Sequence, residues 1–407
     1  MAAHRRRPST ITGIALWLAL ATSGCSLVAP IPAQAPGGAS AAGAAGESPS
    51  AAAGRALVPG AATPTGVIAQ FPRRIALLLP LSGPTAAAAA AIRDGFVAAW
   101  LQQDPAARPD VRIYDVAATP LPAAYDAAVA DGADFVVGPL TKQSVDALVP
   151  LANGRLPVLA LNYLPDGMHA PRQFYQFALH PEDEARSVAK RLIADGHPRG
   201  VVMVPDGDWG TRVANAFSSE LTGLGGAVLA LAHYDPTQVD FSDIIRSELQ
   251  VHEARGEVPS HRPDASFVFV AGPPQITRLV MPQLKFHFAG DLPVYSMPDG
   301  YAPDTLANAD IDHMFFPDMP WMVGSDPATV AVRDAIHSAW PALATRFDRL
   351  YAFGFDAYRL VPALRSGYFD GGAPLAGVTG ALSLDRDGRI HRALVWARIQ
   401  DGIAKPL

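Results

Sequence analysis

The sequence contains one cysteine, Cys25, among its 407 residues. A domain folded from this chain therefore has no internal disulfide and depends on its hydrophobic core for stability. Basic residues do not outnumber acidic ones, because 32 Lys and Arg stand against 38 Asp and Glu, for a formal net charge of −6. This balance disfavours nonspecific nucleic-acid binding. The sequence also lacks an apolar run long enough to cross a bilayer comfortably.

Catalytic and cofactor-binding motifs are absent as well. We find no Gly-x-Ser-x-Gly elbow, no Walker A loop and no His-Glu-x-x-His. Residues 187–190 read Ser-x-x-Lys, but the companion motifs Ser-Asp-Asn and Lys-Thr-Gly are missing, so a solvated lysine is the simpler interpretation. The histidines are scattered without ligand spacing, which leaves a metal site unsupported. We therefore expect a protein without catalytic residues, metal or cofactor.

The N-terminus has the layout of a secretory signal peptide. Three arginines precede a short uncharged apolar run, and small residues then lead to Cys25. Residues 1–24 resemble a bacterial lipoprotein signal, although Thr22 stands where leucine is usual. This resemblance implies a lipid on Cys25, which would attach the protein to a membrane. Ser26 replaces the Asp that favours retention at the inner membrane, which implies the outer membrane, facing the periplasm. The alternative is an ordinary secreted protein in which Cys25 is incidental.

Residues 25–70 comprise this cysteine and a segment made almost entirely of Ala, Gly, Pro, Ser and Thr. Glu47 and Arg55 are its only charges. Such a segment buries too little apolar surface to offset the entropy lost on ordering. The composition predicts a flexible tether, which at about 45 residues would span roughly 35–40 Å on average. An anchored domain could then work at a distance from its membrane.

The remaining chain, residues 71–407, has the pattern of an α/β protein. Short continuous apolar runs alternate with helical periodicity, which is typical of parallel strands covered on both faces. The clearest helix is 182–195, with Pro181 in its first turn and Gly196 after its end. We expect strands at 75–79, 135–137, 157–161, 201–204, 227–231, 267–270 and 293–295.

The C-terminal part predicts an antiparallel hairpin. Apolar segments 381–384 and 393–399 flank Asp385–Gly388, which ends in the strong turn signal Asp-Gly. A calcium loop is the alternative for this turn, but the residues that follow supply no later glutamate ligand. The length also predicts two lobes. We place one lobe at about 71–180 and 298–370, and the other at about 181–297 and 371–407.

Several strings resemble the type I periplasmic binding proteins, a two-lobed fold. They are 79–84 (LPLSGP), 137–140 (VGPL), 206–210 (DGDWG) and 354–358 (GFDAY). A closer similarity is to the LppC/LpoA lipoproteins. It is carried by 281–286 (MPQLKF), 289–295 (AGDLPVY), 316–321 (FPDMPW), 377–380 (GVTG) and 395–398 (VWAR).

The resemblance implies an outer-membrane lipoprotein that binds and activates a class A penicillin-binding protein, a peptidoglycan synthase. The best-known members carry a helical-repeat domain before this region, where the present chain has only the tether. The alternative is a lipoprotein that captures an amino acid or similar solute for an ABC-type transporter.

Ligands of this fold bind between the lobes, at the carboxyl ends of strands. Thr141 and Ser144 could hold a ligand carboxylate, but no acid stands out to hold its ammonium group. The other interpretation is that these loops cap helices and pack the surface between the lobes. Trp321 is a candidate partner contact if it is exposed, and a core residue if it is not. The possible cleft-lining residues are Ser82, Thr141, Ser144, Asn162, Trp209 and Ser296.

Overall fold

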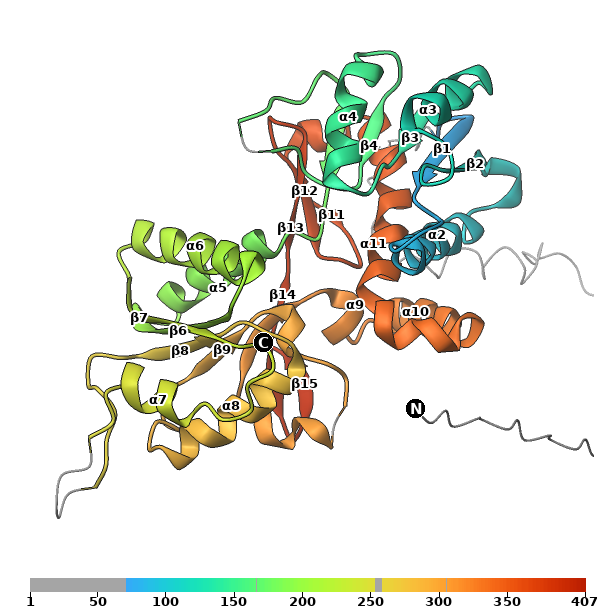
Figure 1. Ribbon diagram of the computed structural model, residues 1–407. Helices are drawn as coiled ribbons and strands as arrows, with labels where there is room; N and C mark the ends of the chain where they lie inside the picture. Colours follow the sequence, from blue (N-terminus) through green and yellow to red (C-terminus); the bar gives the residue numbers. More distant parts are fainter. Residues whose placement is uncertain (1–70, 166, 253–257, 305) are drawn as a thin grey trace, which may run out of the picture. The chain divides into compact units, whose positions relative to one another are not determined.

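The computed structural model describes residues 71–165, 167–252, 258–304 and 306–407 (Figure 1). The predicted signal peptide, Cys25 and the tether lie outside these described residues. Two mostly parallel sheets, each flanked by helices, form two lobes, which confirms the predicted α/β class. Within the described part of the chain, no helix is both long and apolar enough to cross a membrane.

The first lobe is built on an eight-stranded sheet with the order β11-β12-β13-β5-β4-β3-β1-β2. Its strands are β1 (Arg74–Leu79), β2 (Asp110–Asp115), β3 (Phe135–Val137), β4 (Val158–Ala160), β5 (Phe174–Phe177), β11 (Leu375–Ala376), β12 (Ala381–Leu384) and β13 (Arg389–Ala393). Its helices are α2 (Ala86–Leu101), α3 (Leu121–Ala130), α4 (Lys142–Ala152), α10 (Pro327–Ala339) and α11 (Pro341–Arg365), with short η1 (Pro105–Ala107) and η4 (Tyr368–Gly371).

The second lobe is built on a seven-stranded sheet with the order β15-β14-β10-β9-β8-β6-β7. Its strands are β6 (Arg199–Pro205), β7 (Ala227–Tyr234), β8 (Phe267–Val270), β9 (Val294–Ser296), β10 (Phe315–Asp318), β14 (Val395–Gln400) and β15 (Ile403–Pro406). Its helices are α5 (Pro181–Ala194), α6 (Asp208–Gly223), α7 (Ser242–Glu248) and α8 (Pro274–Phe286), with short η2 (Pro298–Gly300) and η3 (Ala307–Ile311). The short helix α9 (Pro320–Val323) follows β10 and carries Trp321 into the core of the first lobe.

The continuous apolar runs are explained by burial on both faces of each sheet. In β1, Leu77 packs in the core beneath α2 and α11, whereas its neighbour Leu78 packs in the core beneath α3 and α4. In β6 of the second lobe, Val201 packs in the core on one face of the sheet and Val202 packs in the core on the other face. All seven strands expected from such runs are present.

The strands β2, β5, β10, β11 and β15 were not predicted. Two of them, β2 and β5, contain no continuous apolar run. β2 is an edge strand whose residues are all exposed or half-buried, and it carries charges at Asp110, Arg112 and Asp115. β5 is interrupted by Gln176, whose buried amide donates to the carbonyl of Asp387 and accepts from the amide of Leu164.

The predicted C-terminal hairpin is confirmed, but its second strand was placed too late in the chain. β12 pairs antiparallel with β13, and the carboxylate of Asp385 accepts the backbone amides of Asp387 and Arg389 in the turn. The segment expected as the second strand is β14, which pairs with β10 and β15 in the other sheet. Only Leu394 separates β13 from β14, so the chain passes between the lobes without a loop to mark the crossing.

The lobe boundaries also differ from those expected, because the structure assigns four strands to the other lobe. β10, at residues 315–318, belongs to the second lobe, whereas β11, β12 and β13 belong to the first. The chain crosses between the lobes after Phe177, after Asp318 and after Ala393. The first lobe thus begins its second segment near residue 319, and the second lobe begins its last segment at about residue 394.

The two helices α2 and α11 approach each other closely through a pair of glycines. A Cβ atom on Gly95 would lie 2.0 Å from the carbonyl oxygen of Tyr351, and one on Gly354 would lie 1.9 Å from that of Ile92. Both obstacles are backbone atoms, which cannot rotate away. The contact therefore requires glycine at both positions.

We predict that Gly354→Ala lowers the free energy of unfolding by about 1–3 kcal/mol, because α11 must move away from α2 to make room for the methyl group. Gly223→Ala is the matched control, since a Cβ there meets no atom within 4 Å and its backbone conformation is an ordinary one. Denaturant unfolding should show the control unchanged or stabilised by up to about 1 kcal/mol. Equal stability of the two variants would contradict the close helix contact.

Candidate functional site

The junction between the lobes contains the candidate site. A pocket of about 280 Å³ lies there, and a second of similar size shares Leu179, Asp299 and Arg349 with it. Arg349 comes from α11 of the first lobe, whereas Asp299 comes from η2 of the second. The first pocket is lined by Leu179, Pro181, Glu184, Trp209, Pro298, Asp299, Met319 and Arg349.

A buried ion pair crosses this junction. The guanidinium of Arg349 donates two hydrogen bonds to Asp318, from Nη2 to Oδ2 at 2.5 Å and from Nε to Oδ1 at 3.1 Å. Nη2 also donates to the carbonyl of Pro298 at 2.8 Å. Burial raises the pKa of the Asp318 carboxyl against the opposing effect of Arg349. The pKa of Arg349 is raised too, because the attraction of Asp318 outweighs the effect of burial.

A second ion pair joins the lobes beside the first. Arg392 of β13 donates from Nη2 to Oε1 of Glu184 on α5 at 2.7 Å, and both side chains are nearly buried. Burial, with the nearby charges of Asp299 and Asp318, raises the pKa of Glu184 to about 7, although Arg392 acts in the opposite direction. Glu184 is therefore an acid that titrates close to neutral pH.

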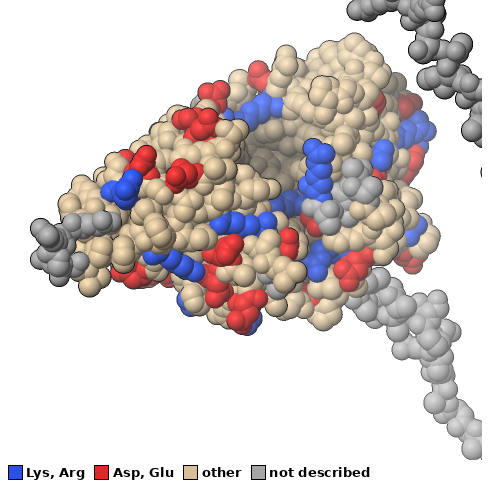
Figure 2. Space-filling model, turned by 60° about the horizontal axis from the view of Figure 1, so that its bottom comes forward, with Lys and Arg blue, Asp and Glu red and all other residues tan. Residues whose placement is uncertain are grey.

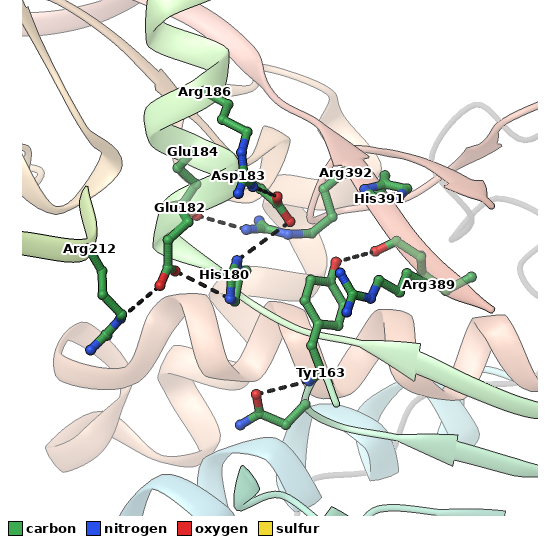
Figure 3. A network of polar contacts seen from close by, with 12 residues as sticks. Tyr163, His180, Glu182, Asp183, Glu184, Arg186, Arg212, Arg389, His391 and Arg392 are labelled. Atoms are coloured by element: carbon green, nitrogen blue, oxygen red, sulfur yellow. Dashed lines mark hydrogen bonds and ion pairs between the residues drawn. The ribbon is translucent and has the colours of Figure 1, made fainter. Parts of the chain in front are cut away.

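The network continues along the start of α5 (Figure 3). Nε2 of His180, the residue before this helix, lies 3.3 Å from Oε2 of Glu182. Oε1 of the same carboxylate accepts from Nε of Arg212 at 2.7 Å. Burial lowers the pKa of His180, which favours a neutral ring. On the first-lobe side, the hydroxyl of Tyr163 donates to the carbonyl of Ile390 at 2.8 Å.

These contacts position the lobes rather than assemble a catalytic group. The carboxylates of Asp318, Glu184 and Glu182 are each bound by a guanidinium, so none is left as a free base toward a substrate. Among the residues that the structure describes, no group of three or more His, Cys, Asp and Glu could hold a metal ion. The junction between the lobes thus contains two ion pairs formed by the chain's own side chains, Arg349–Asp318 and Arg392–Glu184. We call these two ion pairs the lock.

The predicted cleft-lining residues do not come together as one site. Trp209 lines the junction pocket. Ser296 is fully buried, and its hydroxyl donates to the carbonyl of Val270. The hydroxyl of Thr141 donates to that of Ser144 and accepts the Ser144 amide, which caps α4.

The remaining two predicted residues also bond within the first lobe. The amide of Asn162 donates to the carbonyl of Leu140, and Ser82 hydrogen-bonds Asp115. Their polar groups already have protein partners, which favours the interpretation that these loops cap helices and pack against one another. Ligand binding in the cleft stays a prediction.

Trp321 is fully buried in the core of the first lobe. Its Nε1 donates to Oδ1 of Asp348 at 3.0 Å, and the same oxygen lies 2.7 Å from Nε2 of His337. The condition for a partner contact, an exposed side chain, is therefore not met, and the alternative role in the core describes the structure.

The residues that form the two ion pairs of the junction carry no motif in the sequence. Glu184 lies in the helix expected at 182–195, where no role was given to it, and Arg349 of α11 lies outside every motif of the sequence. Asp318 lies within the string 316–321, so the resemblance pointed to its neighbourhood but not to its role. An acid at the end of a buried strand is the one signal that could have marked it, because a fully buried carboxylate requires a partner.

We predict that Glu184→Gln changes the pH dependence of stability. The folded-state pKa of about 7 exceeds the ordinary value of 4.5, so folding takes up a proton between these values. The stabilisation from this group is complete below about pH 4.5 and is lost as the pH rises through 7. Relative to the unchanged chain, Glu184→Gln should therefore gain stability from pH 5 to pH 8, by roughly 3 kcal/mol at most.

Denaturant unfolding at pH 5, 6, 7 and 8 measures this difference. Glu220→Gln on α6 is the matched control, since its carboxylate is partly exposed and lies 3.7 Å from Lys190. Its stability difference should stay nearly constant with pH. A constant difference for Glu184→Gln as well would show that Glu184 ionises at an ordinary pH.

Known proteins with similar sequences and similar structures share the two-sheet architecture of this chain. A penicillin-binding protein activator LpoA from Vibrio antiquarius (strain Ex25) is 28% identical over 357 residues, which cover 80% of this chain. The C-domain of LpoA (YraM) from Haemophilus influenzae, described as a regulator of PBP1A, matches with a TM-score of 0.67 and 26% identity, over 82% of this chain and 99% of that domain. A putative branched-chain amino acid ABC transporter from Chromobacterium violaceum ATCC 12472 matches with a TM-score of 0.61 and 27% identity, over 80% of this chain and 99% of that one.

The aligned region covers only 57% of the length of the Vibrio relative. A family model described as "LppC putative lipoprotein" matches residues 47–402, which include every strand of both sheets except the last. The chain belongs to this LppC lipoprotein family.

Proposed function

We propose that this chain is an outer-membrane lipoprotein that binds a class A penicillin-binding protein and raises its rate of peptidoglycan synthesis, without catalysing a reaction itself. The observation that carries the proposal is the match to the Haemophilus C-domain, because it spans 99% of a domain described as a regulator of PBP1A. The part shared with these relatives thus corresponds to a whole regulatory domain.

The junction supports a binding protein over a solute receptor. A receptor of this fold needs an open space and free polar groups between its lobes. Here Arg349 and Arg392 fill that position with ion pairs to Asp318 and Glu184. Each of the two adjoining junction pockets, at about 280 Å³, is also just below the range of about 300–1,000 Å³ for ligand sites.

Solute capture for a transporter is the second candidate, and the similarity to the Chromobacterium protein favours it. The two functions are distinguished by their partners. An activator acts by differential binding, stabilising the competent conformation of its synthase more than the resting one. A solute receptor would instead bind a small molecule tightly in the absence of any protein partner.

We predict that the mature chain, kept soluble by Cys25→Ser, accelerates glycan polymerisation or cross-linking by a purified class A penicillin-binding protein. Allosteric couplings of about 1–3 kcal/mol correspond to roughly 5- to 150-fold changes, so we expect an increase within that range at saturation. The control reaction omits the synthase and should show no product. Absence of binding and of any rate change, together with tight binding of an amino acid in calorimetry, would support the solute receptor.

Membrane attachment is tested separately. We predict that Cys25→Ala moves the chain from the membrane fraction to the soluble periplasmic fraction, because the acyl chains that hold it are lost. Ser26→Ala is the matched control and should stay in the outer membrane. Ser26→Asp should shift the chain toward the inner membrane. Unchanged fractionation of Cys25→Ala would exclude lipid anchoring at this residue.

A further inference from the structure

A third pocket lies on the first lobe, away from the junction. It has a volume of about 260 Å³ and opens between the end of α2 and the C-terminal half of α11. Ala99, Phe355 and Tyr358 line it, and each of these side chains is at most 5% exposed. The pocket is therefore an apolar hollow in the surface of a well-packed core.

The polar groups at this pocket already have partners. Arg359 is the one charged side chain among the described residues that line it, and its Nη1 lies 3.4 Å from Oδ1 of the fully buried Asp356. The hydroxyl of Tyr358 donates to the side-chain oxygen of Gln103. Neither group demands a charged or polar ligand, so the pocket favours an apolar occupant.

The described chain begins at the rim of this pocket. Phe71, the first described residue, lines the pocket and stacks on Tyr358 with the ring centres 5.5 Å apart. The ring of Tyr358 also packs edge-on against Phe96 of α2, at 5.1 Å between ring centres. This stacking holds Phe71 against the pocket wall, so the residues that precede it in the sequence start beside the pocket.

Two aliphatic residues come shortly before this point in the sequence. Residues 66–71 read Gly-Val-Ile-Ala-Gln-Phe. An extended chain advances about 3.3–3.6 Å per residue, so Ile68 lies within roughly 10 Å of Phe71 and Val67 within roughly 14 Å. A cavity of about 150 Å³ holds the six carbons of benzene. The larger pocket therefore has room for the seven side-chain carbons of Val67 and Ile68.

Attachment to the same chain favours these two residues over a separate partner. A segment on a short linker has an effective concentration in the millimolar range at its site. A small apolar contact that is too weak to join separate molecules can form at such a concentration. Long-range electrostatics offers no competing site on the face seen in Figure 2, where acidic and basic side chains are interspersed.

We propose that Val67 and Ile68 bind in this pocket, so that the tether leaves the first lobe between the ends of α2 and α11. The free part of the predicted tether is then residues 25–66. This attachment lies on the two helices that are joined by close backbone contact at Gly95 and Gly354. The inference does not depend on the proposed function, because it requires only the pocket and the residues before Phe71.

Disulfide trapping in the soluble mature chain tests this placement. Cys25 is the only cysteine, so Cys25→Ser leaves no thiol, and a bridge between two introduced cysteines is unambiguous. The trapping pair is Ile68→Cys with Gln102→Cys, because Gln102 lines the pocket and a disulfide needs Cα atoms within about 7 Å of each other. We expect this bridge to form within one chain, roughly tenfold or more faster than the bridge of a control pair.

The matched control pair is Ile68→Cys with Asp110→Cys. Asp110 is exposed, does not line the pocket and donates its backbone amide to the carbonyl of Arg73. Because Arg73 is two residues from Phe71, an unbound segment would reach Asp110 about as readily as Gln102. Equal rates of bridge formation in the two pairs would overturn the proposal.

A further pair of variants tests the apolar contact itself. Val67→Asp, added to the trapping pair, should lower its rate of bridge formation to that of the control pair, because a carboxylate loses hydration in an apolar pocket. Leu57→Asp places the same charge on another aliphatic residue of the tether and should leave the rate unchanged. A rate that survives Val67→Asp, or bridges that form only between two copies of the chain, would also overturn the proposal.

Discussion

The ion pair between Arg349 and Asp318 is the interaction on which the arrangement of the lobes depends. Asp318 is fully buried at the end of β10, where the chain leaves the second lobe, and Arg349 reaches it from the long helix of the first. Loss of either partner would leave a buried charge without compensation, which costs about 3–5 kcal/mol. The pair therefore penalises any arrangement of the lobes that separates the two groups. Glu184 and Arg392 repeat this constraint at a second crossing, only a few residues from Leu394.

This lock also limits what the junction can do. Solute receptors of the fold use the space between their lobes to hold a ligand. In this protein, guanidinium groups and carboxylates of the chain itself occupy that space and satisfy one another. The exposed carboxylate of Asp299, which lines both junction pockets, is not part of these pairs. The ion pairs therefore occupy part of the space between the lobes, and ligand binding there stays a prediction.

The strings of the family resemblance lie at both edges of the second sheet. The segment 316–321 contains Asp318 of the lock and Trp321 of the first-lobe core. The segments 281–286 and 289–295 line a pocket with Arg398 at the opposite edge. Phe286 is exposed although it belongs to such a string, so this side chain does not contribute to the core. The strings of the resemblance therefore contain both buried and exposed residues.

The sequence by itself determined the α/β class, because short apolar runs such as the one that contains Leu77 and Leu78 alternate with helical periodicity, which is typical of sheets covered on both faces. It also determined the turn at Asp385–Gly388, whose geometry is local. The tertiary structure alone decided the crossing at Leu394 and the pairing of Glu184 with Arg392, which are 208 residues apart. Both depend on which sheet accepts a strand and which charges are buried together. These are long-range outcomes of packing, and composition, periodicity and turn signals carry no information about them.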